Sequence, residues 1–307
     1  MTKRTLLPVA YTRRLYRQVN IVDGHLHFFA LETGDYHWLK PQNPPYWQDK
    51  QAIALSCDER SLTLSSGHTL AGYVHVEAGF DNERPWREIR YLEQRAQLPF
   101  KSVASIDLCS ERTLSDIQTL AGFSSVAGLR HILDEQAAPI LTHPKTKHAL
   151  KRCSEFGMSF DAQLDVGDLN AVSALLRVLE ALPALSVIIN HAGSSLLGSA
   201  VTATYIKQWR INMKVLAQCP RVAVKLSGWE MQCRDWHWRC AQNVVVETVA
   251  IFGVSRVMLA SNFPLSNWRH SYQALWLQYE KMLAQFTFDE KCSLLANNTA
   301  RWYGLDI

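Results

Sequence analysis

Short runs of apolar, strand-forming residues recur along the whole chain, and longer stretches with helical periodicity separate them. Eight such runs occupy residues 21–29, 70–78, 100–108, 126–133, 158–165, 186–193, 222–228 and 256–263. Strands that alternate with helices of this length indicate βαβ units and a parallel sheet. Eight such units close naturally into a barrel. The pattern therefore predicts an α/β fold of the (β/α)8 TIM-barrel type.

The helical stretches follow the 3.6-residue period of an amphipathic helix. They are predicted at residues 86–98, 170–182, 204–218, 241–253, 271–283 and 288–304. Thr287 and Glu290 have the spacing of a capping box before the last of them. No repeat or Gly/Ser linker divides the sequence, so we expect residues 1–307 to form one domain. The alternative, a doubly wound open sheet, would need a glycine-rich turn after the first strand, and residues 23–28 do not provide one.

Polar residues recur with a period of two near the ends of the predicted strands. Since alternate side chains of a strand share a face, Asp23, His25 and His27 point the same way. The other polar residues at such positions are His75 with Glu77, Asp161 with Gln163, Lys225 with Ser227, and Arg130, His191 and Asn262. The carboxyl ends of TIM-barrel strands carry the active site, so this set predicts one there.

A histidine in an apolar strand has two interpretations. A single one, such as His75, is more typical of a core residue with a satisfied side chain. Two imidazoles at positions i and i+2, as in His25 and His27, are costly as packing and useful as metal ligands or as a pair that holds a carbonyl. The spacing therefore favours a functional role for His25 and His27.

The segment DGHLHFFALETGDYHWL at residues 23–39 resembles the opening of the amidohydrolase-2 group, which includes L-fuconolactonase, L-rhamnonolactonase and 2-pyrone-4,6-dicarboxylate lactonase. Later segments that are similar to this family are VHVEA, VAGLRHIL, FDAQL, INHAG, VKLSG, SNFP and NNTARWYGL. The resemblance covers the chain from Ile21 to Leu305. It implies a TIM-barrel hydrolase that opens lactones of sugar acids, often without a metal, and it has metal-binding decarboxylase relatives.

The resemblance also implies roles for individual residues. His25, His27 and His191 would polarise the lactone carbonyl, directly or through a divalent ion, because stabilising the developing oxyanion is commonly the largest catalytic effect. Arg130 would hold a carboxylate or hydroxyl of the substrate. The remaining residues expected to bind substrate are Gln163, Lys225, Trp38 and Tyr36.

Asn262 departs from the family pattern, in which an aspartate precedes the aromatic residue and proline of this segment. An amide cannot take a proton from water, although it can orient water or bind a metal weakly through its oxygen. Three interpretations follow. Glu77 or His191 is the base; the protein binds a lactone but turns it over poorly; or the scaffold performs a different reaction.

The metal ligands are also incomplete. A binuclear centre needs a lysine on a middle strand, where this chain has Gln163. A mononuclear site of His25, His27 and His191 remains open, since three histidines and water satisfy zinc. Without the anionic ligand it would hold its ion loosely. We expect either no required cofactor or one weakly held divalent ion, zinc or manganese.

Aromatic residues are dense in two of the predicted strand-end loops. The first contains Tyr36, Trp38 and Trp47, and the second contains Trp236 and Trp238. Flat rings suit the apolar faces of sugars in such loops. Packing within a lid or between subunits explains them equally well, and burial of Trp236 against a partner would make a homodimer.

Composition narrows the class of protein. The formal net charge of +4, with a basic stretch near the N-terminus, is too mild for a nucleic-acid surface. No signal peptide and no membrane span is expected. Seven cysteines without a CxxC pair indicate reduced thiols in the cytoplasm. The partner is a small molecule: a sugar lactone, an aromatic or dicarboxylic acid for a metal-dependent decarboxylase or hydrolase, or a ligand that is bound without turnover.

Overall fold

Eight parallel strands form the centre of the fold in this computed structural model, which describes residues 18–193, 196–198 and 201–307. They pair in chain order, each parallel to the next. The strands are β1 (Val19–Leu26), β2 (His68–Val76), β3 (Phe100–Ser105), β4 (Val126–Asp134), β5 (Ser159–Leu164), β6 (Val187–Ile189), β7 (Val222–Leu226) and β8 (Val257–Leu259). The predicted (β/α)8 barrel is confirmed. The basic segment 1–17 lies outside the described residues.

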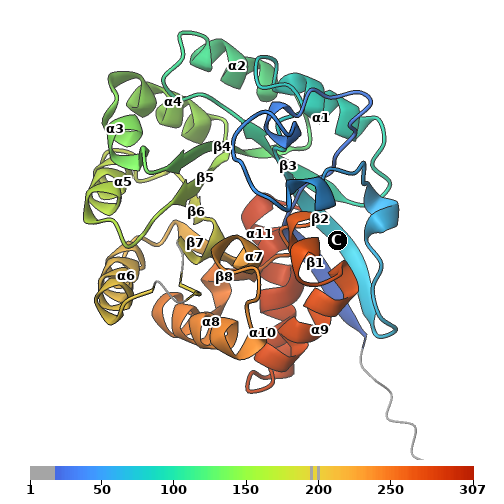
Figure 1. Ribbon diagram of the computed structural model, residues 1–307. Helices are drawn as coiled ribbons and strands as arrows, with labels where there is room; N and C mark the ends of the chain where they lie inside the picture. The colour runs from blue at the N-terminus through green and yellow to red at the C-terminus, as the bar shows by residue number, and fades with distance from the viewer. Residues whose placement is uncertain (1–17, 194–195, 199–200) are drawn as a thin grey trace, which may run out of the picture.

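Helices surround the strands, and Figure 1 shows them following one another around the barrel. They are α1 (Trp86–Glu93), α2 (Thr113–Leu120), α3 (Ala137–Thr142), α4 (Pro144–Glu155), α5 (Leu169–Ala181), α6 (Ala203–Leu216), α7 (Trp229–Gln232), α8 (Trp238–Phe252), α9 (Tyr272–Met282), α10 (Phe288–Cys292) and α11 (Asn298–Tyr303). None of the helices in the described part of the chain is long and apolar enough to cross a membrane.

The helices predicted from periodicity are present as α1, α5, α6, α8 and α9, with shifted ends. The segment predicted as one last helix is divided, because a π-helical turn at Ser293–Asn297 separates α10 from α11. The capping box of Thr287 and Glu290 is confirmed at the start of α10. Helices α2, α3, α4 and α7 occupy segments where the periodicity singled out no helix.

Helix α5 illustrates how local sequence directs the chain toward the site. Asp168 caps its N-terminus, where the carboxylate accepts a hydrogen bond of 2.8 Å from Asn170 N. Ala171, Val172 and Leu175 then recur at helical spacing on its buried face. The cap fixes the loop between β5 and α5 at the carboxyl end of the barrel.

The barrel closes where the chain beyond β8 meets the end of β1. Leu26 and Phe263 form a parallel bridge there. Two backbone hydrogen bonds of 2.7 Å complete this closure seam, from Asn262 N to the His25 carbonyl and from His27 N to the Phe263 carbonyl. The seam therefore fixes Asn262 beside the two histidines of the first strand.

One apolar cluster fills the barrel interior, since its members come from strands on opposite sides of the barrel. The strand residues of this cluster are Val74 and Val76 of β2, Val103 of β3, Ile188 of β6, Ala223 of β7 and Met258 of β8, and Tyr303 of α11 packs with them. The interior positions of β2 are thus taken by valines, and the prediction that His75 faces the interior is wrong. Its ring lies in the outer layer, with Nε2 3.8 Å from Glu88 Oε1 of α1. The alternation of faces that turns His75 outward does not apply to Glu77, because Glu77 follows the end of β2.

Candidate active site

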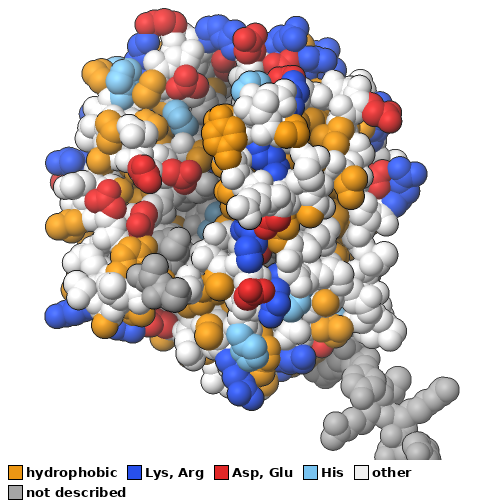
Figure 2. All heavy atoms as spheres, in the orientation of Figure 1, with side chains coloured by type: hydrophobic (Ala, Val, Ile, Leu, Met, Phe, Trp, Pro, Cys, Tyr) orange, Lys and Arg blue, Asp and Glu red, His pale blue; other side chains and the backbone are white. Residues whose placement is uncertain are grey.

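A cavity of about 620 Å³ opens at the carboxyl ends of the strands. Figure 2 shows the hollow near the centre of this face. Seven of the residues predicted for the site line it, namely His27, Trp38, Glu77, Arg130, Gln163, His191 and Asn262. The barrel therefore brings together side chains that the sequence holds far apart.

Three imidazoles form a cluster, in which His27 and His191 line this cavity, whereas His25 is fully buried and does not line it. The ring of His25 packs against His27 and His191, with centroid separations of 5.0 and 4.6 Å. Burial lowers the pKa of His27 and of His191 to about 3, and it holds the pKa of His25 well below its usual range. All three rings are neutral near physiological pH, which is the form that accepts a proton or binds a metal.

His27 presents a lone pair to the cavity. Its Nδ1 lies 2.8 Å from the Val76 carbonyl oxygen and 3.1 Å from that of Glu77. Since both neighbours are acceptors, Nδ1 carries the proton of the neutral ring, and Nε2 is left as an acceptor. Nε2 in turn lies 3.3 Å from Asn262 Oδ1, which is also an acceptor. Two facing acceptors favour a donor, such as water, or a cation that lies beside both of them.

Glu230 holds the Asn262 amide in this orientation. Asn262 Nδ2 donates a hydrogen bond of 2.6 Å to Glu230 Oε1, so Oδ1 faces His27. Glu230 is buried, and its burial raises the pKa of the carboxyl to about 7. The sequence prediction missed Glu230 because it lies on the short helix α7 beyond β7, outside any strand. A glutamate between apolar residues directly after a polar strand end was the available signal.

Arg130 is already engaged by protein groups. Its Nε donates to Glu77 Oε1 at 2.8 Å, and its Nη2 donates to the Glu77 carbonyl oxygen at 3.0 Å. Nη1 donates to Gln163 Oε1 at 3.1 Å. A substrate carboxylate would have to compete with the buried Glu77 ion pair for this guanidinium. The arrangement leaves one N–H of Nη1 for a neutral oxygen.

The residues expected to bind substrate divide into two groups. Trp38 lines the cavity, and its indole N–H donates to the Ala78 carbonyl oxygen at 2.7 Å. Tyr36 and Lys225 do not line it. Tyr36 is buried in the loop after β1, where its hydroxyl accepts a hydrogen bond from Ala30 N. Lys225 is fully buried within the barrel and pairs with Asp161 at 2.7 Å.

The cluster satisfies part of what a divalent ion needs. Both ring nitrogens of His25 are buried and lack a hydrogen-bond partner among the described residues. Together with His27, His191 and the Asn262 oxygen they form a donor set that suits zinc or manganese. In the described ranges, however, no three His, Cys, Asp or Glu side chains converge closely enough to hold a metal as they stand. The chemistry of the donors fits a loosely held ion, and their spacing would have to close around it.

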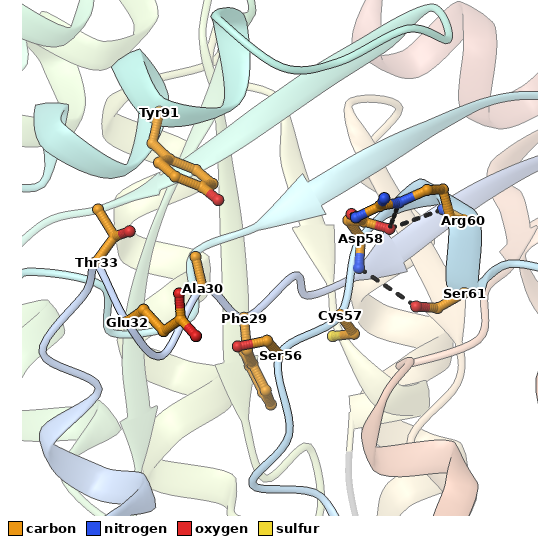
Figure 3. A pocket seen from close by; sticks show the side chains of 10 residues that line it. All are labelled: Phe29, Ala30, Glu32, Thr33, Ser56, Cys57, Asp58, Arg60, Ser61 and Tyr91. Carbon is orange, nitrogen blue, oxygen red and sulfur yellow. Dashed lines mark hydrogen bonds and ion pairs between the residues drawn. The ribbon is translucent and has the colours of Figure 1, made fainter.

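A second cavity, of about 390 Å³, lies beside the loop after β1 and shares no lining residue with the first (Figure 3). Its charged pair neutralises itself, since the Arg60 guanidinium binds the Asp58 carboxylate. Burial raises the pKa of the Cys57 thiol to about 12, so the nucleophilic thiolate is scarce at neutral pH. This cavity offers no group as suited to catalysis as the histidine cluster.

Trp236 is 3% exposed within the single chain, where its ring lies against Trp229 and His270. Its burial therefore requires no partner subunit. The homodimer remains a prediction, and the burial of Trp236 no longer supports it.

Gly228 sets the position of His191, and its replacement tests this contact. A Cβ atom at Gly228 would lie 2.5 Å from His191 Nδ1, so Gly228→Ala is expected to push the imidazole toward solvent. The pKa of His191 should then rise from about 3 toward the ordinary value, measured by NMR titration of the ring protons.

Gly304→Ala is the matched control for this variant. Both glycines are left-handed, with φ of 68° and 62°, so both changes cost about 1–2 kcal/mol of backbone strain. A Cβ atom at Gly304 meets nothing within 4 Å. An unchanged His191 titration in Gly228→Ala would show that the glycine does not set the ring position.

Comparison with known proteins places this site in a family. The chain is 29% identical over 299 residues to the uncharacterised protein y4mH of Sinorhizobium fredii, covering 93% of this chain and 98% of that protein. An amidohydrolase from Burkholderia multivorans with bound zinc has a TM-score of 0.77 at 19% identity, covering 93% of this chain and 99% of that one. A putative 2-pyrone-4,6-dicarboxylic acid hydrolase from Pseudomonas putida has a TM-score of 0.68 at 20% identity, with coverage of 94% and 99%.

At these identities the two solved structures show a shared fold. The family model gives stronger evidence, because it matches almost the whole barrel, including every histidine of the cluster. The amidohydrolase model spans residues 22–305, and the chain therefore belongs to the amidohydrolase family.

Proposed function

We propose that this chain hydrolyses the lactone of a sugar acid to the open aldonic acid. The charge of the cavity is the observation that carries this proposal. Among the described residues that line it, Arg130 is the sole Lys or Arg, and Glu77 already neutralises it. A substrate carboxylate would meet no unpaired cation, and Asp134 on the same wall would repel it. A neutral lactone suits this wall better than an aromatic or dicarboxylic acid.

His27 and Asn262 together provide the place for the attacking water. A water molecule that lies beside both atoms, within hydrogen-bond distance of each, donates one hydrogen to His27 Nε2 and the other to Asn262 Oδ1. Asn262 orients the water and His27 accepts its proton as the oxygen attacks the carbonyl carbon. This assignment removes the need for an aspartate at position 262. With His27 as the base, Glu77 is not needed for that role and remains bound to Arg130.

Negative charge then develops on the carbonyl oxygen. Arg130, with its remaining N–H, and His191 line the same cavity and can donate to that oxygen. As the ring C–O bond breaks, the proton on His27 passes to the departing ring oxygen. The carboxylic acid that forms ionises and releases one proton to solvent. In an alternative, ion-bound form, His25, His27 and His191 would hold a zinc or manganese ion that supplies Lewis-acid polarisation of the carbonyl; His27 would not act as the base in that form, because the ion would occupy its Nε2 lone pair.

Aromatic side chains shape the opposite wall. Trp38 and Trp47 line the cavity, with ring centroids 6.2 Å apart in an edge-to-face arrangement. A flat apolar ring face suits the C–H face of a sugar-derived ring. The wall therefore supports a cyclic substrate.

The test is an acid-release assay with a panel of aldono-1,4-lactones, using a pH indicator and subtracting the spontaneous rate. Each lactone is measured with chelator, with added Zn²⁺ and with added Mn²⁺. We expect at least one lactone to open at a rate that the double variant His25→Ala, His191→Ala does not reach. We also expect added ions to raise the rate and a chelator to remove that gain, because the ion is held loosely.

The proposal would be overturned if no lactone of the panel released acid faster than its spontaneous rate. If the lactones then still raise the melting temperature of the protein, the chain is a binding protein on an enzyme scaffold, since binding alone stabilises by mass action. If they do not, the cavity takes another class of substrate.

A further inference from the structure

A second chamber adjoins the active-site cavity on the side of β4 and β5. It has a volume of about 360 Å³. The two spaces share the side chains of Asp134, Gln163, His191 and Met231 in their walls. A substrate held by the histidine cluster can therefore extend into this outer chamber.

Four carboxylates line the outer chamber, Asp134, Glu135, Asp165 and Asp168, and none of its described lining residues is Lys or Arg. Within the described part of the chain, none of the four forms an ion pair with a basic side chain. Figure 2 shows acidic side chains gathered beside the central hollow. Four carboxylates without a counter-charge on one wall create a negative potential that attracts cations.

The hydrogen bonds of these carboxylates leave them open to a ligand. Asp134 Oδ1 accepts from Gln163 Nε2 at 3.1 Å, and Asp168 Oδ1 accepts from the backbone at the start of α5. Asp165 Oδ1 accepts from the Tyr205 hydroxyl at 2.6 Å. Each of these bonds fixes one oxygen and orients the carboxylate, while the other oxygen accepts no hydrogen bond from the residues that the structure describes.

Asn190 is independent evidence that the chamber binds a polar group. It lines the chamber at 1% exposure, and neither Oδ1 nor Nδ2 has a hydrogen-bond partner in the described residues. Leaving both polar atoms of a buried amide unpaired costs about 1–3 kcal/mol each. An ammonium group could donate to Oδ1, and a hydroxyl oxygen of the same substrate could accept from Nδ2.

We propose that the outer chamber binds a protonated amine at the end of the substrate remote from the lactone carbonyl. The inference rests on the proposed lactone hydrolysis only for the identity of the reacting end. The ammonium group donates to the free oxygens of Asp165 and Asp168, and charge-assisted bonds of this kind are the stronger ones. The same field repels the carboxylate that forms on hydrolysis and so promotes release of the product.

The test compares an aldono-1,4-lactone with the same lactone whose terminal hydroxyl is replaced by an amine. We expect wild-type kcat/KM for the amine to exceed that for the parent by at least about tenfold. The preference should fall as NaCl is raised, because exposed carboxylates are screened. In Asp165→Asn, Asp168→Asn the preference should vanish, because kcat/KM for the amine falls toward the value for the parent lactone in the same variant. Asparagine retains an acceptor oxygen at both positions and remains a good helix cap at 168.

Glu83→Gln, Glu180→Gln is the matched control. It removes the same amount of charge from two exposed side chains that do not line the chamber, and it should keep the preference. Equal kcat/KM for the two lactones, or a preference that survives loss of Asp165 and Asp168, would overturn the inference.

Calorimetry separates this inference from the proposed reaction. The dissociation constants of both lactones are measured with His27→Ala, alone and combined with Asp165→Asn, Asp168→Asn. If neither lactone is opened by the wild type, the proposed reaction fails. The inference then stands if the amine still binds at least about tenfold more tightly through the two aspartates, and it fails if both lactones bind alike.

Discussion

Replacing His27 by alanine is expected to slow lactone opening by about 100-fold, the lower end of the usual contribution of a general base, because a pKa of about 3 makes the imidazole a weak base. The Nε2 atom of His27 is the acceptor that faces Asn262 at 3.3 Å, and alanine removes the destination of the water proton. KM should change less than kcat, because Trp38, Arg130 and Gln163 still form the wall. Steady-state kinetics on the best lactone of the panel gives both values.

His75→Ala is the matched control for His27→Ala. His75 is another fully buried imidazole whose burial lowers its pKa to about 3, and neither of its nitrogens has a hydrogen-bond partner among the described residues. It differs in facing the outer layer instead of the cavity. It should lower stability and reduce kcat by less than about tenfold. Similar losses of kcat in the two variants would contradict the assignment of His27 as base.

Replacing Lys225 by methionine is expected to destabilise the protein by about 3–5 kcal/mol, because it leaves the buried Asp161 carboxylate without its cation. Lys225 and Asp161 are both fully buried at 2.7 Å, and the Tyr303 hydroxyl donates to the same carboxylate. Thermal unfolding should show a fall in melting temperature on the order of 10 °C. KM of the folded fraction should stay unchanged, since Lys225 does not line the cavity.

Two further variants show whether the loss comes from the unpaired carboxylate. Adding Asp161→Asn to Lys225→Met should recover part of the stability, because the neutral amide needs no counter-charge. Lys40→Met breaks the exposed pair with Asp35 and should cost about 0–1 kcal/mol. A large rise in KM for Lys225→Met without loss of stability would restore Lys225 to the substrate-binding set.

The strands and most of the site could be predicted from the sequence, because apolar runs and polar strand ends obey simple periodicities. Parity alone could not place His75, since it does not say which face of β2 is interior until Val74 and Val76 pack against the other strands. The sequence also could not show how far along the barrel axis a side chain lies. Lys225 has the interior parity expected of a site residue but lies where Asp161 and Tyr303 surround it.

Contacts made by residues in the segments that follow the strands were harder to predict. Glu230 reaches Asn262 because the chain turns into α7 just beyond the end of β7. Helical or strand periodicity in the sequence does not predict the direction of such a turn. Tyr36 was predicted to bind substrate because it lies in an aromatic-rich loop. Its hydroxyl instead accepts a hydrogen bond from Ala30 of the same loop. Sequence patterns locate elements and faces; contacts between loops depend on the assembled barrel.

The closure seam between β1 and the chain beyond β8 ties the proposed catalytic groups to the last step of assembly. Hydrogen bonds join His25 and His27 to residues more than 230 positions later, so neither the water site nor the histidine cluster exists until nearly the whole chain has left the ribosome. Contacts of such long sequence separation form late and slowly. A chain that ends before Phe263 lacks this seam and the proposed water site, so we expect it to open no lactone.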